Sequence, residues 1–465
     1  MKLNIRIYNF LPNKSMSKLT LTNSLSKEIF NGCQKFSGCL SKPQQRNFRE
    51  VVRGMLLSGS IFLNRIGNVS SNEIVDRKNT ERLSNLMSKI DTDNFHQIHI
   101  NSKIKKYKDE PILVFADGGD VQKPHAKKME KVCKCVDGSN GHRIGKGYPT
   151  FALQAYGTET KRLTNLTQHL WSSQSEDYKS NWFEQKKCFD WLKNINESST
   201  RDMIVIEDRG GDDKKRFLYF LEELRSSFIT RICAGNKSRN LIVEDEYGKE
   251  EILSVKEISQ NIKNKASHPR IWKNKKTKKV LTSKIAFKKV YLPNKSNKKG
   301  IPNIPLYVIF AFSQGYDQPL TIITDLEVKD AETAWKYFFY YKKRWEIENF
   351  FRAEKQNFSV EKFLIRDFNK IRALLFVVMF VFSFLIELQQ KAKDFLGSLY
   401  ILFKQFCKQK QRSANHHLDM LVFLRETLSG ICHEYSYRFC SCKISKNRFV
   451  TDRNQLRLFS VREKW

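Results

Sequence analysis

The chain has 465 residues and a formal net charge of +34, from 83 Lys plus Arg against 49 Asp plus Glu. Its hydrophobic content of 40%, with 12% aromatic residues, excludes a globally disordered chain, and its length suggests roughly two to four packed units. The charge predicts a polyanionic partner, because each phosphate that Lys or Arg neutralises releases condensed counterions.

A membrane surface is also anionic, but the sequence does not favour one. Residues Met1 to Asn13 lack the sustained apolar core and the small-residue cleavage site of a secretory signal. The strongest apolar run, Ala373 to Ile386, falls short of the roughly twenty residues that cross a bilayer, so we expect a buried helix there. No membrane partner is predicted, and the expected location is the cytoplasm.

Ten cysteines are scattered along the chain, which without a secretory signal predicts reduced thiols. The pairs Cys133/Cys135 and Cys440/Cys442 have a shorter spacer than ordinary zinc fingers, and we interpret them as unligated small side chains. A metal-binding alternative stays open at the second pair, because His433 lies nearby in sequence.

Residues 1–105 are predicted to form a polar, helical domain. Apolar residues recur at helical spacing from Gln44 to Arg65, among several arginines, and the segment 82–90 continues the pattern. Residues 103–109 are expected to form a charged linker. The domain is interpreted as one that binds DNA ends, although a helical appendage with merely solvated arginines fits the same pattern.

An α/β catalytic core is predicted to begin with residues 106–235. A short apolar strand from residue 112 ends in Asp117-Gly-Gly-Asp120, and a second strand, Met203 to Glu207, ends in Asp208-Arg209-Gly-Gly-Asp212. Each strand delivers a carboxylate at its end, which is where open α/β sheets build sites.

The residues after the second strand allow more than one interpretation. Arg209 either contacts DNA or pairs with Glu207 or Asp212. Asp212 is a weaker site candidate and is expected to cap the helix that begins near Lys214.

Residues 236–325 read as a β-rich, basic insertion. Between residues 261 and 300 there are fourteen Lys or Arg and no Asp or Glu, which favours contact with DNA over a solvated basic loop. The segment 306–325 is predicted to be a hairpin that returns the chain to the main sheet.

The second part of the core, residues 326–395, carries a predicted helix from Ala331 to Gln356. Along it lie Tyr341, Arg344, Glu348 and Lys355, at offsets of 0, 3, 7 and 14 that share one helical face. A solvated amphipathic helix with internal ion pairs is the alternative. Residues 396–465 are expected to form a C-terminal helical and basic region.

Three acids from separate elements, Asp117, Asp208 and Glu348, suit phosphoryl transfer by two divalent cations. Two such cations about 3.5–4 Å apart can activate the attacking oxygen and stabilise the leaving one. No Gly-x4-Gly-Lys-Ser/Thr loop supports NTP-driven chemistry, and no persuasive Ser-His-Asp or Cys-His arrangement is found.

At these residues the chain resembles the DDE transposases of bacterial insertion sequences, specifically the IS-four family with its Tn-five-like members. The family signature Tyr-x2-Arg-x3-Glu-x6-Lys is matched by Tyr341, Arg344, Glu348 and Lys355. The resemblance covers about residues 111–390. It also includes a strand followed by Asp-Gly and a later strand followed by Asp-Arg-Gly, in the same order as in the family. It implies a ribonuclease-H-like mixed sheet flanked by helices, with a β-rich insertion between the second Asp and the Glu.

The resemblance also implies the chemistry. Asp117, Asp208 and Glu348 would be catalytic and would hold two Mg²⁺ ions, for which Mn²⁺ can substitute, while Tyr341, Arg344 and Lys355 would position DNA. The enzyme would nick the ends of its element and join the freed 3′-hydroxyl to target DNA, as a dimer assembled on the terminal repeats. One departure is Gly119, where many relatives have Thr, and Asp120 follows it. Strand termination favours Asp117 over Asp120 as the first ligand.

Two other functions stay open from the sequence. A non-catalytic or domesticated DNA-binding relative would need only the charge, and a nuclease on the same fold would cut DNA without joining the ends.

Overall fold

The computed structural model describes residues 18–70, 76–107, 110–138, 141, 143–196, 202–273, 280–293 and 305–394. The helices within these residues are α2 (Lys18–Gln34), α3 (Lys42–Ser58), α4 (Leu63–Ser70), α5 (Asp76–Met87), α6 (Thr92–Ile104), α7 (Asn181–Asn196), α8 (Lys214–Leu218), α9 (Val255–Ile262), α10 (Ala331–Lys343), α11 (Trp345–Ala353) and α12 (Phe368–Asp394). The predicted C-terminal region, including Cys432, His433, Cys440 and Cys442, lies outside the described residues.

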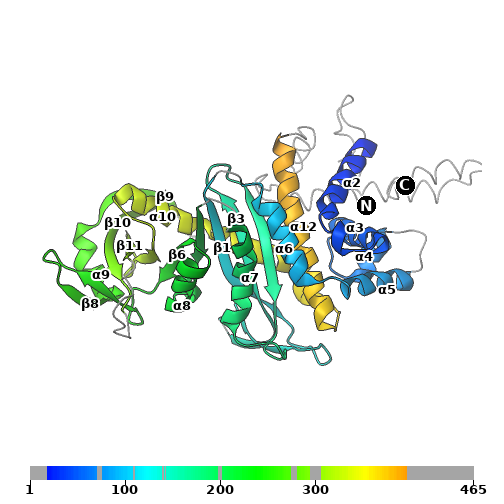
Figure 1. The fold of residues 1–465 in the computed structure, drawn as a ribbon, viewed down its shortest axis with the longest axis horizontal. Coiled ribbons are helices and arrows are strands. Elements are labelled where there is room, and N and C mark those ends of the chain that lie inside the picture. The colour runs from blue at the N-terminus through cyan, green and yellow to red at the C-terminus, as the bar shows by residue number, and fades with distance from the viewer. Residues whose placement is uncertain are drawn as a thin grey trace, which may run out of the picture.

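The described strands form one sheet of twelve members. They are β1 (Ile112–Gln122), β2 (Cys133–Asp137), β3 (Arg143–Gly157), β4 (Leu163–Leu170), β5 (Met203–Glu207), β6 (Ser227–Ile232), β7 (Asn240–Glu244), β8 (Glu250–Ser254), β9 (Ser267–Lys273), β10 (Val280–Tyr291), β11 (Pro305–Ser313) and β12 (Leu320–Thr324). In Figure 1 the β7–β11 part lies at one end of the molecule, helices α2–α5 lie at the other, and β1 and β3 lie between them.

The middle of the sheet mixes two kinds of pairing. β1 is antiparallel to β3 and parallel to β5, and β5 is parallel to β6, while β4 pairs with β3. The parallel strands are uninterrupted apolar runs such as Met203–Glu207, as expected for strands covered on both faces. Helices α7 and α8 lie on one side of these strands (Figure 1). This mixed, helix-flanked sheet is compatible with the ribonuclease-H-like fold that was predicted.

The predicted insertion is built of strands that continue the same sheet. β12 pairs with β6 and with β11, so the hairpin at 305–324 returns the chain to the central strands as predicted. β10 pairs with β11 along one edge, and along its other edge it pairs with β9 near its start and with β7 at Tyr291. β8 then pairs with β7 at the border of the sheet. Part of the basic stretch 261–300, namely 274–279 and 294–300, lies outside the described residues.

The N-terminal helices share a core with α12. Phe36 stacks on Phe95 with ring centroids 4.5 Å apart, and it also contacts Phe376 and Phe380 of α12. The predicted helical segment from Gln44 to Arg65 is divided, because Gly59 ends α3 in the left-handed conformation with φ of 56°. The predicted domain boundary near residue 105 stays a prediction.

Helix α12 confirms the expected buried helix but is longer than the apolar run suggested. Its stretch Phe368–Leu388 has 21 residues with mean hydropathy 2.4, so by length and composition it could cross a membrane. In the structure 89% of that window is buried inside the protein, against β4 and the N-terminal helices. The stretch therefore serves as the core helix of this fold.

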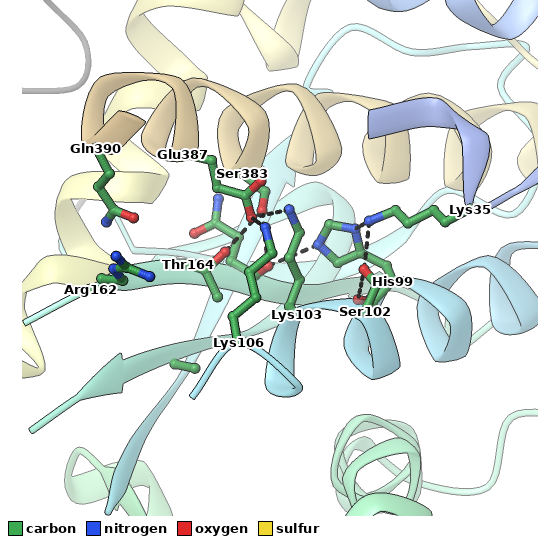
Figure 2. Close-up of polar contacts among 12 residues, drawn as sticks. Lys35, His99, Ser102, Lys103, Lys106, Arg162, Thr164, Ser383, Glu387 and Gln390 are labelled. Carbon is green, nitrogen blue, oxygen red and sulfur yellow. Dashed lines mark hydrogen bonds and ion pairs between the residues drawn. The ribbon is translucent and has the colours of Figure 1, made fainter. Parts of the chain in front are cut away.

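A polar cluster, which we call the Glu387 cluster, lies where α6, β4 and α12 meet (Figure 2). Lys103 and Lys106 both donate to Oε1 of Glu387, the second over 2.8 Å. Lys35 Nζ lies 2.9 Å from His99 Nδ1 and 3.0 Å from Ser102 Oγ. The start of the predicted linker 103–109 is thus wrong, because Lys103 is the buried last turn of α6, only 4% exposed, and ties that helix to α12.

Candidate active site

Two aspartates meet because of the register between β1 and β5. The strands run parallel and pair from Ile112 with Met203 to Ala116 with Glu207, so Asp117 and Asp208 are the next residue on each. The prediction that the first strand ends at Asp117 is wrong, since β1 continues to Gln122, paired with β3. Asp117 instead marks the point where β1 is no longer paired with β5 and keeps only β3 as its neighbour.

The predicted single helix from Ala331 to Gln356 is in fact two helices that meet at Arg344. The Arg344 N–H donates to the Tyr341 carbonyl and the Ile347 N–H donates to the Arg344 carbonyl, each over 3.0 Å, which is the tighter i to i+3 pattern. A π-helical turn, Glu354–Phe358, then follows α11. Tyr341, Arg344 and Glu348 still face the strand ends, but Lys355 is displaced from them.

Arg344 is the centre of the site. Its Nη1 lies 2.5 Å from Asp117 Oδ2, and its Nη2 lies 2.7 Å from Glu348 Oε1 and 3.6 Å from Asp208 Oδ2. The residue is only 4% exposed, so these interactions occur in a poorly solvated place where they are strong. Three carboxylates from β1, the end of β5 and α11 thus converge on one guanidinium.

The two aspartates have opposite pKa shifts. Burial, together with the charges of Asp208 and Glu348, raises the pKa of Asp117 to about 6 against the attraction of Arg344. Burial also acts on Asp208, but Arg344, the Arg209 backbone N–H and Arg231 outweigh it and lower the pKa. Asp208 is therefore the more firmly ionised of the pair. Asp117 takes up a proton more readily, because of its burial and of the excess negative charge in the site.

Two further side chains hold Asp208. The Tyr341 hydroxyl donates to Asp208 Oδ1 over 3.0 Å, and burial raises the pKa of this tyrosine to about 12. Arg231 of β6 places Nη1 3.6 Å from the same oxygen. Sequence reasoning missed Arg231, although a lone arginine within the apolar strand Ser227–Ile232 was a visible signal.

Asp120 belongs to a different group of residues. Its Oδ2 lies 2.9 Å from Lys355 Nζ, which is also 3.0 Å from Glu361 Oε1. Asp117, and not Asp120, is the aspartate of β1 that shares Arg344 with Asp208 and Glu348. The geometry therefore favours Asp117 as the first acid of the site, for a different reason than strand termination. Lys355 contacts two carboxylates here.

A family model described as the transposase DDE domain matches residues 108–384 of the chain. The chain belongs to this transposase family. The matched residues contain β1, β5 and α11, and thus all three acids that surround Arg344. None of the curated proteins compared with the chain matches it.

Gly119 accounts for how closely α11 approaches β1 in this transposase. A Cβ at Gly119 would lie 2.8 Å from Thr150 Oγ1 and 3.1 Å from the Phe351 ring. A side chain at this position would require the side chains of Thr150 and Phe351 to shift. Gly119 thus lets the helix that carries Glu348 pack directly on the strand that carries Asp117.

The structure also resolves the neighbours of Arg209. Buried Glu207 pairs with Arg216, and Asp212 Oδ1 pairs with Arg239 Nε over 3.0 Å. These contacts favour the alternative in which Arg209, which is exposed, is available to a ligand. The N-cap of α8 lies one residue later than predicted, because Asp213, and not Asp212, accepts the hydrogen bond at the start of this helix.

Transposases of this family generally use a divalent metal ion. The donor set around Arg344 fits one, since carboxylate oxygens are the ligands that hard divalent cations prefer. Within the described residues, no three His, Cys, Asp or Glu side chains are close enough together to form a metal cluster. The guanidinium lies between the three carboxylates, so a metal ion bound by Asp117, Asp208 and Glu348 would compete with Arg344 for them.

Proposed function

We propose that this transposase moves a bacterial insertion sequence of the IS-four, Tn-five-like type. It would cleave DNA at the element's terminal inverted repeats and transfer the freed 3′-hydroxyl to target DNA. The convergence of Asp117, Asp208 and Glu348 on Arg344 is the observation that carries the proposal. The order of the four signature residues on α10, α11 and the following turn supports it.

The three carboxylates are assigned to hold two Mg²⁺ ions, with Mn²⁺ as a substitute. Such ions supply activation of the attacking oxygen and charge neutralisation at the scissile phosphate. The chain's own residues then have separate tasks. Tyr341 orients Asp208, and exposed Arg209 contacts the DNA backbone. Arg344 balances the charge of the three carboxylates and would be available to a DNA phosphate if these carboxylates held metal ions.

Lys355 is assigned a phosphate contact through the same signature. In the structure it is held between Asp120 and Glu361, and its side chain is 27% exposed. We propose that it reaches the DNA strand by exchanging one of these carboxylates for a phosphate. The remaining expectations, a dimer assembled on DNA and a location in the cytoplasm at the nucleoid, belong to the same proposal.

The test uses the full-length protein and duplexes that carry the inverted repeats flanking its reading frame. In Mg²⁺ the wild type should nick these ends and join them to a second duplex. Asp208→Asn and Glu348→Gln should each lower nicking by on the order of 10³-fold, because several kcal/mol of charge stabilisation are lost. Binding of the ends should change little.

Glu346→Gln is the matched control on the same helix, because Glu346 contacts Asn349 and not Arg344. Nicking that survives in Asp208→Asn and Glu348→Gln would overturn the assignment of the site. Nicking without joining would identify a nuclease, and salt-sensitive binding without either activity would identify a non-catalytic relative.

A further inference from the structure

Strand β2 and the first part of β3 form a two-stranded ribbon next to the last residues of β1, five residues beyond Asp117. Lys134 pairs with Lys146 across it, and Val136 pairs with Ile144. All four side chains are exposed, with Val136 at 51% and Ile144 at 75% of their surface. Because alternate residues of a strand share a face, these four make one surface, which we call the ribbon face.

Folding does not account for the composition of the ribbon face. Like charges directly opposite each other destabilise a strand pair, and two exposed β-branched side chains gain nothing from burial. The opposite face, by contrast, carries buried Cys133 and Cys135 and holds the ribbon to the protein. Residues 123–146 contain seven Lys or Arg and two acids, so the whole segment is cationic.

The ribbon is fixed to the acid-bearing strand. The Gly138 N–H at its turn donates to Asp120 Oδ1 over 3.2 Å, and Gln122 Nε2 of β1 donates to the Val136 carbonyl of β2 over 3.4 Å. A Cβ at Gly147 would lie 2.2 Å from the Val121 carbonyl oxygen, so only glycine permits this close approach of β3 to β1. The ribbon face therefore keeps a set position relative to Asp117, five residues before Gln122 on the same strand.

We propose that the ribbon face binds duplex DNA next to the cleavage position. This inference rests on the proposed function, which makes DNA the substrate. Lys134 and Lys146 bind backbone phosphates, whose charge removes the repulsion between them, and Val136 and Ile144 pack against sugar edges in the minor groove. A second copy of the chain is a poorer occupant, because two ribbon faces would bring four lysines together.

The test measures binding of the full-length protein to the terminal-repeat duplex in Ca²⁺, over a series of salt concentrations. The double variant Lys134→Gln/Lys146→Gln should bind roughly tenfold more weakly, and the slope of log K against log salt should fall by about 2, one for each phosphate contact. Val136→Thr/Ile144→Thr should weaken binding several-fold with the slope unchanged.

The control is Lys161→Gln/Lys179→Gln, which removes the same charge from exposed lysines that lie outside the ribbon, the N-terminal helices and the basic insertion. A slope that falls equally in the control and the ribbon variant overturns the proposal, as does dissociation of a dimer by the ribbon variants alone. If the wild type binds but never nicks, the proposed function fails while the ribbon result still stands. If it nicks and the ribbon variants bind normally, only the ribbon proposal fails.

Discussion

Two polar sites in the molecule have unequal numbers of positive and negative groups, with opposite sign. One is the site around Arg344, which we call the acid site, and the other is the Glu387 cluster. At the acid site, three carboxylates surround one cation, Arg344. At the Glu387 cluster, Lys103 and Lys106 share one carboxylate, and Lys35 lies close by (Figure 2). Both lie at the junction of helices and strands, and both carry a surplus of one sign.

The two sites differ in how their excess charge is accommodated. Burial, reinforced by the charge of Lys103, lowers the pKa of Lys35 well below its usual value, so Lys35 gives up its proton more easily than a solvated lysine does. Asp117 and Asp208 lie where β1 outruns β5, and their side chains stay 24% and 37% exposed. The partly exposed acid site, with its excess of negative charge, can therefore accept a further cation. The buried Glu387 cluster, with its excess of positive charge, instead joins α6 to α12.

Removing Arg344 should have the largest effect. Arg344→Ala leaves three carboxylates without their shared cation, which should lower the free energy of unfolding by about 3 kcal/mol. Millimolar Mg²⁺ should restore more stability to this variant than it adds to the wild type, as measured by chemical denaturation. Arg352→Ala, on the exposed side of α11, is the control. A loss that Mg²⁺ does not reduce would contradict the idea that this site accepts cations.

Removing Glu387 is the converse experiment. Glu387→Gln leaves buried Lys103 without its carboxylate and should lower the free energy of unfolding by about 2 kcal/mol. Mg²⁺ should not restore it, since this cluster has no surplus of acid. Glu332→Gln is a suitable control, because its ion pair with Arg270 is largely exposed. A Mg²⁺ response in Glu387→Gln would break the contrast between the clusters.

The two clusters should also respond to pH in opposite senses. The folded pKa of Glu387 is about 2, since Lys103 and Lys106 outweigh burial, so its stabilisation is present above its ordinary value of 4.5 and is lost as pH falls toward 2. The folded pKa of Asp117 is raised to about 6, so lowering the pH from 6 toward 3.8 favours the folded state.

Stability should therefore rise on acidification below about pH 6 and fall below about pH 4.5. Asp117→Asn should remove part of the rise, because burial also raises the pKa of Glu207 to about 7 and of Glu354 to about 8, and Glu387→Gln should remove part of the fall, in denaturation curves recorded at successive pH values. A rise of unchanged size in Asp117→Asn would show that Asp117 does not contribute to it.

The smallest effect is expected at the rim of the Glu387 cluster. Lys106 lies 2.8 Å from Glu387 Oε1, but its side chain is 48% exposed, so water already solvates it. Lys106→Met should change the free energy of unfolding by less than about 1 kcal/mol. A loss as large as that of Glu387→Gln would mean that Lys106, and not Lys103, is the main partner.

Much of the site could be predicted because its residues follow regular local rules. Asp208 comes directly after an apolar strand, and Tyr341, Arg344 and Glu348 keep helical spacing, so their elements were identifiable. The true extent of β1 could not be predicted, because Gly118 and Gly119 suggest a turn. Pairing with β3 instead extends the strand through both glycines. The hydrogen bonds to a partner strand distant in sequence thus outweigh the turn preference of the two glycines.

Other features depend on contacts that sequence spacing does not contain. Lys355 contacts Asp120, three residues beyond Asp117 on β1, and lies in a π-helical turn that nothing in the spacing reports. The Glu387 cluster was not predicted at all, since Lys103 and Glu387 are 284 residues apart. Its partial signal was an acid within the otherwise apolar helix α12.

The position of α12 in the chain has a consequence for biosynthesis. Its partners α3, α5, α6 and β4 all precede it, so a ribosome releases them long before the helix that covers them. Until Phe368–Leu388 emerges, Phe36, Phe48 and Phe95 lack the rings that complete their cluster. The nascent N-terminal half then exposes an aggregation-prone surface. We expect expression of fragments that end before residue 368 to depend strongly on chaperones.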